Sequence, residues 1–573
     1  MRRSSPLLYS LLCAVLALAC QGTGMRPSEP SRLGAEEFTV VEASIAELQA
    51  ALTEGRVTSR RIVEEYLARI GMYDARLRAT VAVNPHALED ADRLDRERAA
   101  GRVRGPLHGI PIALKDNIQT LDMPTTGGAI AFDGFMAPYE ARLVTDLREA
   151  GAIILAKTTL TELANWVATG MPNNYNALNG YGMNPYDPRR DPRPGHDDGR
   201  AVLDTGGSSS GIGTAANFWA GNVGTETSGS IQIPASNNML ASVKPTVGLI
   251  SRHGIIPITA DQDTAGPMAK HVADLAVLLD AMATGVDAND PATGVCAPPP
   301  GGYVAALDRG ALQGARIGIP RAYYYEAVTP PGAREPRGGL TRAEADLMRR
   351  AIAELERAGA IVVDPVAIPS IVATNADDNQ LCFETCYDLP QRKGGDASCS
   401  VVLKYGMKRD FDAWLASLGS AAPVDSLTAL REFNLAHEQR GAIKYGQAEL
   451  DISDEMDVVG DVERYLADRA KDLRLCRTEG IDAALEAHDL DALLFPAWTS
   501  ESMLNKAGYP AVGVPFGFVP NDVAPPLPDG FDPKPLPYGV SFVGTACSEA
   551  RLLGLAYAFE QLTRSRVAPP EFP

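Results

Sequence analysis

A strand, a helix and a second strand follow one another between residues 109 and 156, and this order constrains the fold more than any other feature. From Gly109 to Lys115, bulky residues alternate with smaller ones, which predicts a strand with Lys115 on its less crowded face. A predicted helix over 141–150 leads to the apolar run 153–156, a second predicted strand. Two strands joined through a helix lie parallel, with a right-handed crossover. The chain is therefore expected to be an α/β protein with a mainly parallel sheet.

Local patterns predict further elements. Ser44 and Glu47 form a capping box ahead of a helix, and Thr58 opens a second helix with an apolar stripe. The run 212–220 is compatible with a helix. The remaining predictions are strands at 315–320, 361–363 and 540–543, a helix at 342–358, and surface loops at 184–204 and 519–536.

Composition limits the number of domains and the kind of partner. The 573 residues are 45% hydrophobic and 22% charged, which is enough apolar material for a large core. We expect one catalytic domain over residues 36–573. The formal net charge is −19 and no stripe is rich in Lys and Arg, so a nucleic-acid partner is not expected. Small or neutral partners fit this charge better.

The N-terminal residues predict export. Two arginines precede a mostly apolar run that is too short for a membrane-spanning helix, so residues 1–19 are expected to be a signal peptide. Two hypotheses stay open: cleavage at a small-x-small site ending at Ala19, or a lipoprotein site that leaves Cys20 as an acylated N-terminus. Residues 20–35 are expected to be a tether, and a lipid anchor at Cys20 would be the membrane contact. The expected location is periplasmic or extracellular.

Six cysteines lie beyond this segment: Cys296, Cys382, Cys386, Cys399, Cys476 and Cys547. Cys382 and Cys386 are spaced as C-x3-C, with no second pair or histidine at zinc-site spacing, so no metal is expected. An exported chain can form disulfides. Isolated buried thiols and one disulfide both stay open.

Two glycine- and serine-rich segments are candidates for a functional site. The first, 206–211, lies between structured regions, which argues against a flexible linker. A phosphate-binding loop is not expected, because no Gly-Lys-Ser/Thr ends it. The second, 224–234, contains Ser230.

These two segments closely resemble the signature of the amidase signature family. The likeness includes the lysine motif Gly109–Asn117 and continues through 242–251, 254–257 and 262–269. It is strong over most of residues 42–285, with a signature core at about 96–285, and returns more weakly at 508–511 and 538–560. The runs 224–227 and 262–269 are most similar to bacterial peptide amidases, which remove C-terminal amide groups from peptides. The resemblance implies a large, mixed, mainly parallel sheet covered by helices on both faces, and amide hydrolysis without a cofactor.

The resemblance also implies the roles of three residues. Ser230 is similar to the nucleophile, Ser208 to the bridging serine that follows an unusual cis peptide, and Lys115 to the base. A serine hydroxyl is a weak nucleophile until its proton is removed, and Ser208 can pass that proton to a neutral Lys115. An unperturbed lysine has a pKa of ~10.4, so burial away from carboxylates must lower the pKa of Lys115. The same relay can protonate the leaving amine.

Backbone N–H groups are implied to stabilise the tetrahedral intermediate in an oxyanion hole, where each donor contributes ~3 kcal/mol in the transition state. These groups belong to Thr227, Ser228, Gly229 and Ser230. Ser209 and Thr225 are expected to support the site by hydrogen bonds.

The chain departs from the family pattern at three places. Ser208 and Ser230 are 22 residues apart, two fewer than expected, so the helix between them or its exit loop must be shortened. Ser228 replaces a common glycine or aspartate. Gln232 stands where many relatives carry an arginine that can anchor a substrate carboxylate, which disfavours acidic, malonamate-like substrates.

The leading hypothesis is hydrolysis of a neutral carboxamide through an acyl-enzyme, with C-terminal peptide amides slightly ahead of fatty and aryl amides. A transamidase-type subunit is the nearest enzyme alternative, although export and the acidic charge argue against it. An inactive amidase fold that serves as a surface binding protein is the alternative from another class.

Overall fold

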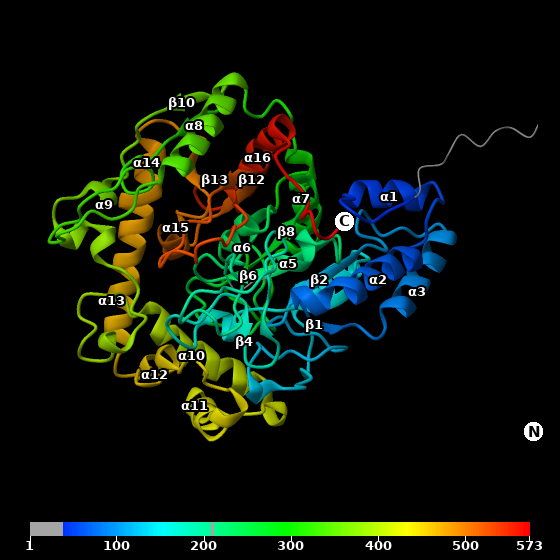
Figure 1. Ribbon diagram of the computed structural model, residues 1–573, viewed down its shortest axis with the longest axis horizontal. Coiled ribbons are helices and arrows are strands. Elements are labelled where there is room, and N and C mark those ends of the chain that lie inside the picture. The colour runs from blue at the N-terminus through cyan, green and yellow to red at the C-terminus, as the bar shows by residue number, and fades with distance from the viewer. Residues whose placement is uncertain (1–37, 208–210) are drawn as a thin grey trace, which may run out of the picture. The chain divides into compact units, whose positions relative to one another are not determined.

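The computed structural model describes residues 38–207 and 211–573, and an eleven-stranded sheet organises this part of the chain (Figure 1). The expected signal peptide and tether, with Cys20, lie outside the described residues, as do Ser208 and Ser209. Residues Thr39–Pro573 form one compact unit. The strand order across the sheet is β1 (Thr80–Val83), β3 (Ile153–Thr158), β2 (Pro111–Lys115), β6 (Gly221–Glu226), β8 (Thr264–Ala269), β7 (Ala241–Lys244), β12 (Ala511–Val519), β13 (Leu536–Val543), β11 (Ala492–Pro496), β9 (Arg316–Gly318) and β10 (Ile361–Val363).

The predicted strand–helix–strand unit is present. β2 and β3 pair in parallel, with Ile112 opposite Ile154, and α4 (Arg142–Glu149) lies between them in the chain. β2 also pairs in parallel with β6 on its other side. The carboxyl ends of β2 and β6 therefore lie next to each other, and this edge of the sheet positions the site.

The sheet is large and mixed, as expected, but it is not mainly parallel. Among the ten strand pairings of the described sheet, four are parallel and six are antiparallel. The antiparallel block runs without interruption from β6 to β11, because β12 and β13 form a hairpin and β7 and β8 turn back on each other. β6, β7 and β8 are rich in Gly, Ser, Thr, Ala and Lys, so no apolar alternation revealed them in the sequence.

Helices cover both faces of this block. α16 (Glu549–Thr563) packs on one face, where its Phe559 contacts Phe542 of β13. α7 (Val272–Met282) lies beside α16 (Figure 1). On the opposite face, Met268 of β8 joins a buried cluster with Ile231 and with residues of α6 (Gln232–Asn237).

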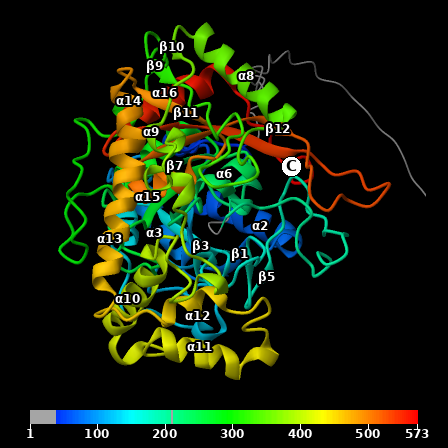
Figure 2. The ribbon, with the colours of Figure 1, turned by 90° about the vertical axis from the view of Figure 1, so that its left-hand side faces the viewer.

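Further helices complete the described part of the chain. The capping box of Ser44 and Glu47 and the cap by Thr58 are confirmed at the first two helices. α10, α11 and α12 lie together, with α13 running up from them (Figure 2). The helices are α1 (Ile45–Thr53), α2 (Ser59–Leu77), α3 (Ala87–Ala99), α5 (Ile212–Ala215), α8 (Arg342–Arg357), α9 (Pro369–Val372), α10 (Val402–Ser417), α11 (Leu427–Ala436), α12 (Ala448–Asp454), α13 (Val462–Leu473), α14 (Ala483–Glu486) and α15 (Glu501–Ala507).

The run 212–220 is helical only over α5. Asn217 has a positive φ of 59°, which ends the helical path. Trp219 folds back onto Gly213, where a Cβ would lie 2.2 Å from the indole. The connection from residue 211 to β6 is therefore a single helical turn followed by a tight reversal.

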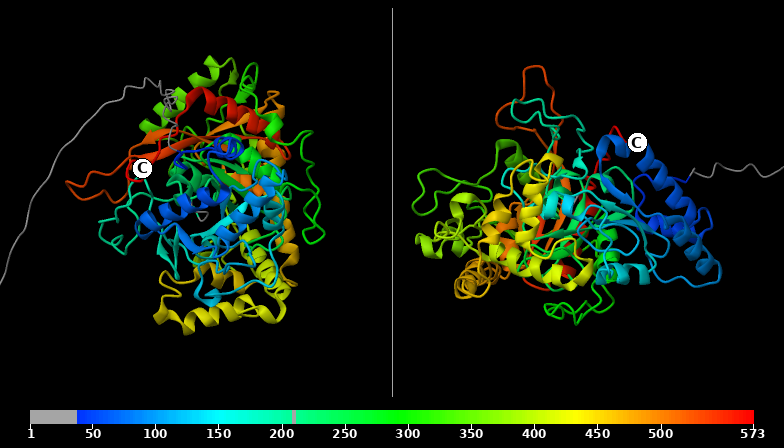
Figure 3. Two further views of the ribbon diagram at one scale, coloured as in Figure 1. Left: turned by 90° about the vertical axis from the view of Figure 1, so that its right-hand side faces the viewer. Right: turned by 90° about the horizontal axis from the view of Figure 1, so that it is seen from below.

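The two predicted surface loops lie side by side and project from the sheet (Figure 3). Arg189 of the first loop stacks on Phe531 of the second at 4.2 Å and donates to Asp532 O at 2.6 Å. Just before the first loop, β4 (Tyr175–Asn176) and β5 (Gly180–Tyr181) pair as a small hairpin.

The cysteine predictions were too cautious, because two disulfides are present. Cys296 pairs with Cys547, and Cys386 pairs with Cys399. Among the described cysteines, Cys382 and the buried Cys476 are free thiols. The first bridge joins residues 251 positions apart, a pairing that spacing alone does not reveal.

Candidate active site

The site begins where β2 and β6 end. Lys115 is the last residue of β2 and Thr225 lies near the end of β6, so the parallel pairing brings their side chains together. Lys115 Nζ donates to Thr225 Oγ1 at 2.8 Å and to Thr225 O at 3.3 Å. Asn117 Nδ2 also donates to Thr225 Oγ1, at 3.0 Å. Thr225 thus holds the amine in place.

Burial changes the protonation of the amine. The side chain of Lys115 is fully buried, and this burial lowers its pKa to about 7, against the opposing effect of the Asp263 and Glu226 carboxylates. The adjacent Asp116 is engaged elsewhere, because Lys157 Nζ lies 3.0 Å from its Oδ1. A substantial fraction of Lys115 is therefore neutral near pH 7 and can accept a proton.

Ser230 lies in the loop between β6 and α6 and is 7% exposed. Gly229, directly before it, has a φ of +78°, and a Cβ there would lie 2.6 Å from Ile233 Cδ1. Only glycine fits this backbone path without strain. The four consecutive residues of the expected oxyanion hole, 227–230, form this loop.

Glu226 holds the end of the loop that leads into α6. Its Oε2 accepts from the backbone N–H groups of Ile231 and Gln232, at 2.6 and 3.0 Å. Its Oε1 accepts from Gln232 Nε2 at 2.6 Å and from Asn505 Nδ2 at 2.9 Å. This buried carboxylate therefore links the start of α6 to α15. It also occupies the side-chain amide of Gln232, which is then not available to bind a substrate.

The segment that leads to Ser208 lies against Ser230. A Cβ on Gly207 would be 3.0 Å from Ser230 Cα, and a Cβ on Gly206 would be 2.6 Å from Ile233 O. Asn174 Nδ2 donates to the carbonyl oxygens of Gly206 and Gly207, at 3.3 and 3.2 Å. The two glycines thus allow a close approach of the two serine-bearing segments that the sequence analysis singled out.

Asp263 supports the other end of the loop. Thr227 Oγ1 donates to Asp263 Oδ1 at 2.5 Å, and Gln262 Nε2 donates to Thr227 O at 3.0 Å. Asp263 Oδ2 accepts from two further backbone N–H groups, those of Ile258 and Thr259. Burial raises the pKa of Asp263 to about 6.

Two cavities flank the loop. One of about 380 Å³ reaches Asn117, Thr225, Thr227 and Asp263. The other, of about 420 Å³, opens beside Ser228, which is exposed. No group of three or more His, Cys, Asp or Glu side chains suited to a metal ion occurs among residues 38–207 and 211–573.

The expected site residues are thus placed as follows. Lys115, Thr225 and the loop 227–230 meet at one edge of the sheet, and Ser208 and Ser209 are outside the described residues. The sequence analysis assigned no role to several organising residues of the site: Asn117, Asn174, Glu226, Asp263 and Glu501. Three of them stand within the quoted motifs, whereas Asn174 and Glu501 lie outside any motif and contact the site only through the fold.

Comparisons with known proteins show which proteins this chain is similar to. The sequence model of the amidase family, described as Amidase, matches residues 61–553. The X-ray structure of the native peptide amidase from Stenotrophomonas maltophilia superposes with a TM-score of 0.75 at 38% identity, covering 92% of this chain and 98% of that one. A probable amidase of Arabidopsis thaliana is 33% identical over 543 residues, 93% of this chain and 92% of its own length. One subunit of the glutamyl-tRNA(Gln) amidotransferase of Chloroflexus aurantiacus is 31% identical over 92% of this chain and 98% of its own length.

The mixed sheet and the similarities define an α/β enzyme that hydrolyses amides. The chain belongs to the amidase signature family, as its motifs predicted.

Proposed function

We propose that the protein hydrolyses neutral carboxamides through an acyl-enzyme on Ser230, with Lys115 as the base and Ser208 as the bridge between them. The observation that carries this proposal is the buried amine of Lys115, with a pKa of about 7, held by Thr225 at the strand ends from which the loop of Ser230 departs. A lysine of ordinary pKa would be protonated and could not act as a base.

The proton balance follows from this arrangement. Ser230 Oγ attacks the amide carbon while its proton passes through Ser208 to the neutral Lys115. The C–N bond then breaks, and the same proton returns through the relay to the leaving nitrogen, which departs as ammonia or an amine. In deacylation, water attacks the acyl carbon and gives one proton to the relay. The bond between this carbon and Ser230 Oγ then breaks, the relay returns the proton to Ser230 Oγ, and the carboxylic acid leaves.

The loop 227–230 would supply the oxyanion hole. Its backbone is fixed at both ends, by Asp263 at Thr227 and by Glu226 at the start of α6. Fixed donors stabilise the oxyanion because they need no reorganisation during the reaction. The rigid support on both sides favours this role.

Peptide amides are the proposed substrates. The similarity to a peptide amidase over 92% of this chain supports this choice. Gln232 is neutral and its amide is bound to Glu226, so nothing at this position offers a positive charge to a substrate carboxylate. Substrates with a free carboxylate next to the amide should therefore react slowly.

Ammonia release from a panel of peptide, fatty and small amides tests the proposal. Release that disappears in Ser230→Ala, together with loss of fluorophosphonate labelling, would establish the nucleophile. Labelling that persists in Ser230→Ala would contradict it. If no amide of the panel releases ammonia, an inactive binding protein is favoured. Activity only toward a glutaminyl substrate of a partner complex would favour a transamidase subunit.

We also propose that residues 1–19 direct export and that Cys20 carries a lipid anchor. The two disulfides support an oxidising compartment, because such bridges persist outside the cytosol. No helix in the described part of the chain is long and apolar enough to cross a membrane. Metabolic labelling with a fatty acid, compared between the native chain and Cys20→Ser, tests the anchor.

A further inference from the structure

The cavity beside Ser228 is lined by two carboxyl groups close to the proposed nucleophile. It has a volume of about 420 Å³, and Glu384 and Glu501 are the charged side chains among its described lining residues. We call it the carboxylate pocket. Its described lining is Ser228, Tyr323, Tyr324, Gly338, Gly339, Gln380, Leu381, Glu384, Thr385, Tyr387, Trp498, Thr499, Glu501, Ser502 and Met503.

Glu501 is fixed next to the loop of Ser230. Its Oε2 accepts a hydrogen bond of 2.7 Å from Ser228 Oγ, two residues before Ser230. A Cβ on Gly229 would lie 3.6 Å from Glu501 Cβ, so the two backbones are close. One turn further along α15, Asn505 binds Glu226 and the carbonyl of Glu501. The carboxylate is thus built into the same assembly that positions the nucleophile.

The basic residues around the pocket form ion pairs with other carboxylates and not with Glu501. Arg337 pairs with Glu384 at 2.8 Å and donates to Leu381 O from outside the pocket. Lys506, the lysine of α15, pairs with Asp472 at 2.8 Å and donates to Phe383 O. Within the described chain no ion pair to Glu501 occurs, so one negative charge of the pocket stays available to a ligand.

Aromatic rings add to this preference for a cation. Tyr323, Tyr324, Tyr387 and Trp498 line the same cavity. The faces of tyrosine and tryptophan rings attract guanidinium and ammonium groups. A carboxylate surrounded by such rings is a suitable environment for an arginine or lysine side chain.

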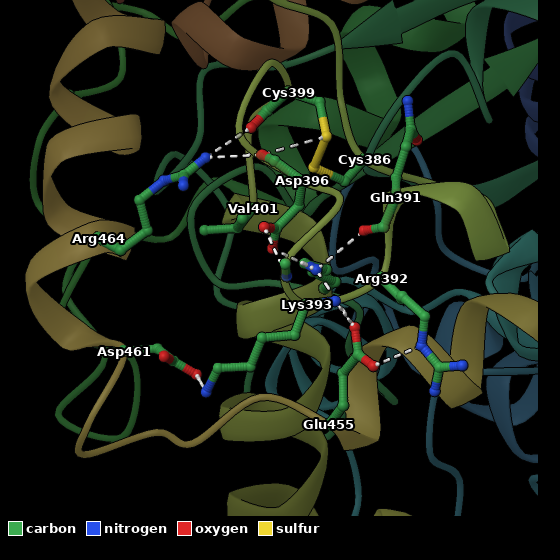
Figure 4. A network of polar contacts seen from close by, with 12 residues as sticks. Cys386, Gln391, Arg392, Lys393, Asp396, Cys399, Val401, Glu455, Asp461 and Arg464 are labelled. Atoms are coloured by element: carbon green, nitrogen blue, oxygen red, sulfur yellow. Dashed lines mark hydrogen bonds and ion pairs between the residues drawn. A yellow bond between two sulfur atoms is a disulfide. The ribbon is translucent and has the colours of Figure 1, made fainter.

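The wall that carries Glu384 and Tyr387 is held in place by covalent and polar contacts (Figure 4). The Cys386–Cys399 disulfide closes the segment directly beside these residues. Buried Lys404 donates to Asp396 Oδ2 at 2.8 Å and to Gln391 O at 3.1 Å inside the loop so formed. Further contacts of this network join Arg464 to Asp396 O and Cys399 O, Lys393 to Asp461, and Arg392 to Glu455. This wall of the pocket is therefore held in place by several contacts.

We propose that the carboxylate pocket binds a cationic side chain on the acyl part of the substrate, so that the preferred substrates are amides of arginine- or lysine-ending peptides. Glu501 would pair with the cation while the scissile amide lies on the adjacent loop 227–230. The inference rests on the proposed amidase function and specifies its substrate class.

Acetyl-arginine amide and acetyl-citrulline amide form the test pair, because citrulline has nearly the same shape as arginine but no charge. The unmodified enzyme is expected to show a kcat/KM at least about tenfold higher for the arginine amide, the ratio that corresponds to ~1.4 kcal/mol. Glu501→Gln should reduce this ratio to near one, and the ratio is read on both amides with the same variant, so that a change common to both rates cancels. Glu335→Gln, an exposed residue that does not line the pocket, is the matched control and should keep the ratio.

The outcomes separate this inference from the proposed function. Equal rates for both amides in the unmodified enzyme, or a ratio that survives in Glu501→Gln, would overturn the carboxylate pocket and leave the amidase intact. Hydrolysis of fatty amides with neither peptide amide accepted would do the same. Failure to hydrolyse any amide would overturn the proposed function, and the inference with it. The first comparison needs no variant, so a misfolded Glu501→Gln would not prevent a decision.

Discussion

Lys115 Nζ lies 2.8 Å from Thr225 Oγ1, at the ends of two parallel strands that are neighbours in the sheet. This contact links the fold to the chemistry, because the pairing of the two strands places Thr225 Oγ1 where it accepts a hydrogen bond from the amine of Lys115. Burial at the same place lowers the pKa of Lys115 to about 7. The basicity of the amine is thus set by its position in the sheet.

Activity should rise with pH through about 7. Below this pH Lys115 is protonated and cannot take the proton of Ser230, and above it the neutral amine predominates, so kcat/KM should increase and then level off. A pH profile of kcat/KM on a neutral peptide amide measures this. A flat profile with the chemical step rate-limiting would argue against Lys115 as the base.

Thr225→Val should lower kcat by roughly tenfold, since the replacement keeps the shape and removes one hydrogen bond of the amine. The lost acceptor stabilises the charged lysine, so the pH midpoint should also move to a lower pH. Thr225→Ser should restore both values. An unchanged midpoint in Thr225→Val would mean that the threonine is only structural.

Glu226→Gln should destabilise the protein by about 2–4 kcal/mol, because an amide nitrogen would replace an oxygen that accepts hydrogen bonds from buried donors. Denaturant titration measures this loss, and Glu335→Gln should stay close to the unmodified stability. Activity should fall as well, since Glu226 fixes the start of α6. Equal stabilities of the two variants would contradict the role given to Glu226.

The sequence predicted those parts of the fold whose signal is local. The alternation from Gly109 to Lys115, the caps at Ser44 and Thr58, and the helix predicted at 342–358 depend on near neighbours. The structure has the strand at Pro111–Lys115, both caps, and the helix at Arg342–Arg357. The antiparallel centre was missed, since β6 has the composition Gly-Asn-Val-Gly-Thr-Glu and is buried by the fold rather than marked by hydrophobicity.

The same distinction applies to the site. Lys115 and the loop of Ser230 were found because they stand in contiguous motifs. Glu501 and Asn174 reach the site from distant segments, one through a serine hydroxyl and the other through two glycine carbonyls. No spacing rule connects such residues, because only the folded sheet brings them together.

Replacing Cys386 and Cys399 together by alanine should loosen the wall of the carboxylate pocket. A bridge across 13 positions contributes roughly 2–3 kcal/mol to the stability of the segment that it closes. We expect KM for a basic peptide amide to rise several-fold while kcat for a small amide stays nearly constant. Replacement of the unpaired Cys476 by alanine controls for loss of a cysteine, and a parallel loss of both activities would indicate general unfolding instead.

The preference for a cationic substrate should itself depend on pH. Burial raises the pKa of Glu501 to about 7; Glu226 and Glu384 add to the increase, while Lys506 and the hydrogen bond from Ser228 oppose it. The carboxylate is therefore largely neutral at pH 5.5 and ionised at pH 8.5, about 1.5 units on either side of that value. The ratio of kcat/KM for arginine amide to that for citrulline amide should accordingly increase with pH. Because Lys115 acts on both substrates alike, its titration cancels in this ratio. A ratio that stays constant between these two pH values would show that Glu501 does not pair with the charged side chain of the substrate.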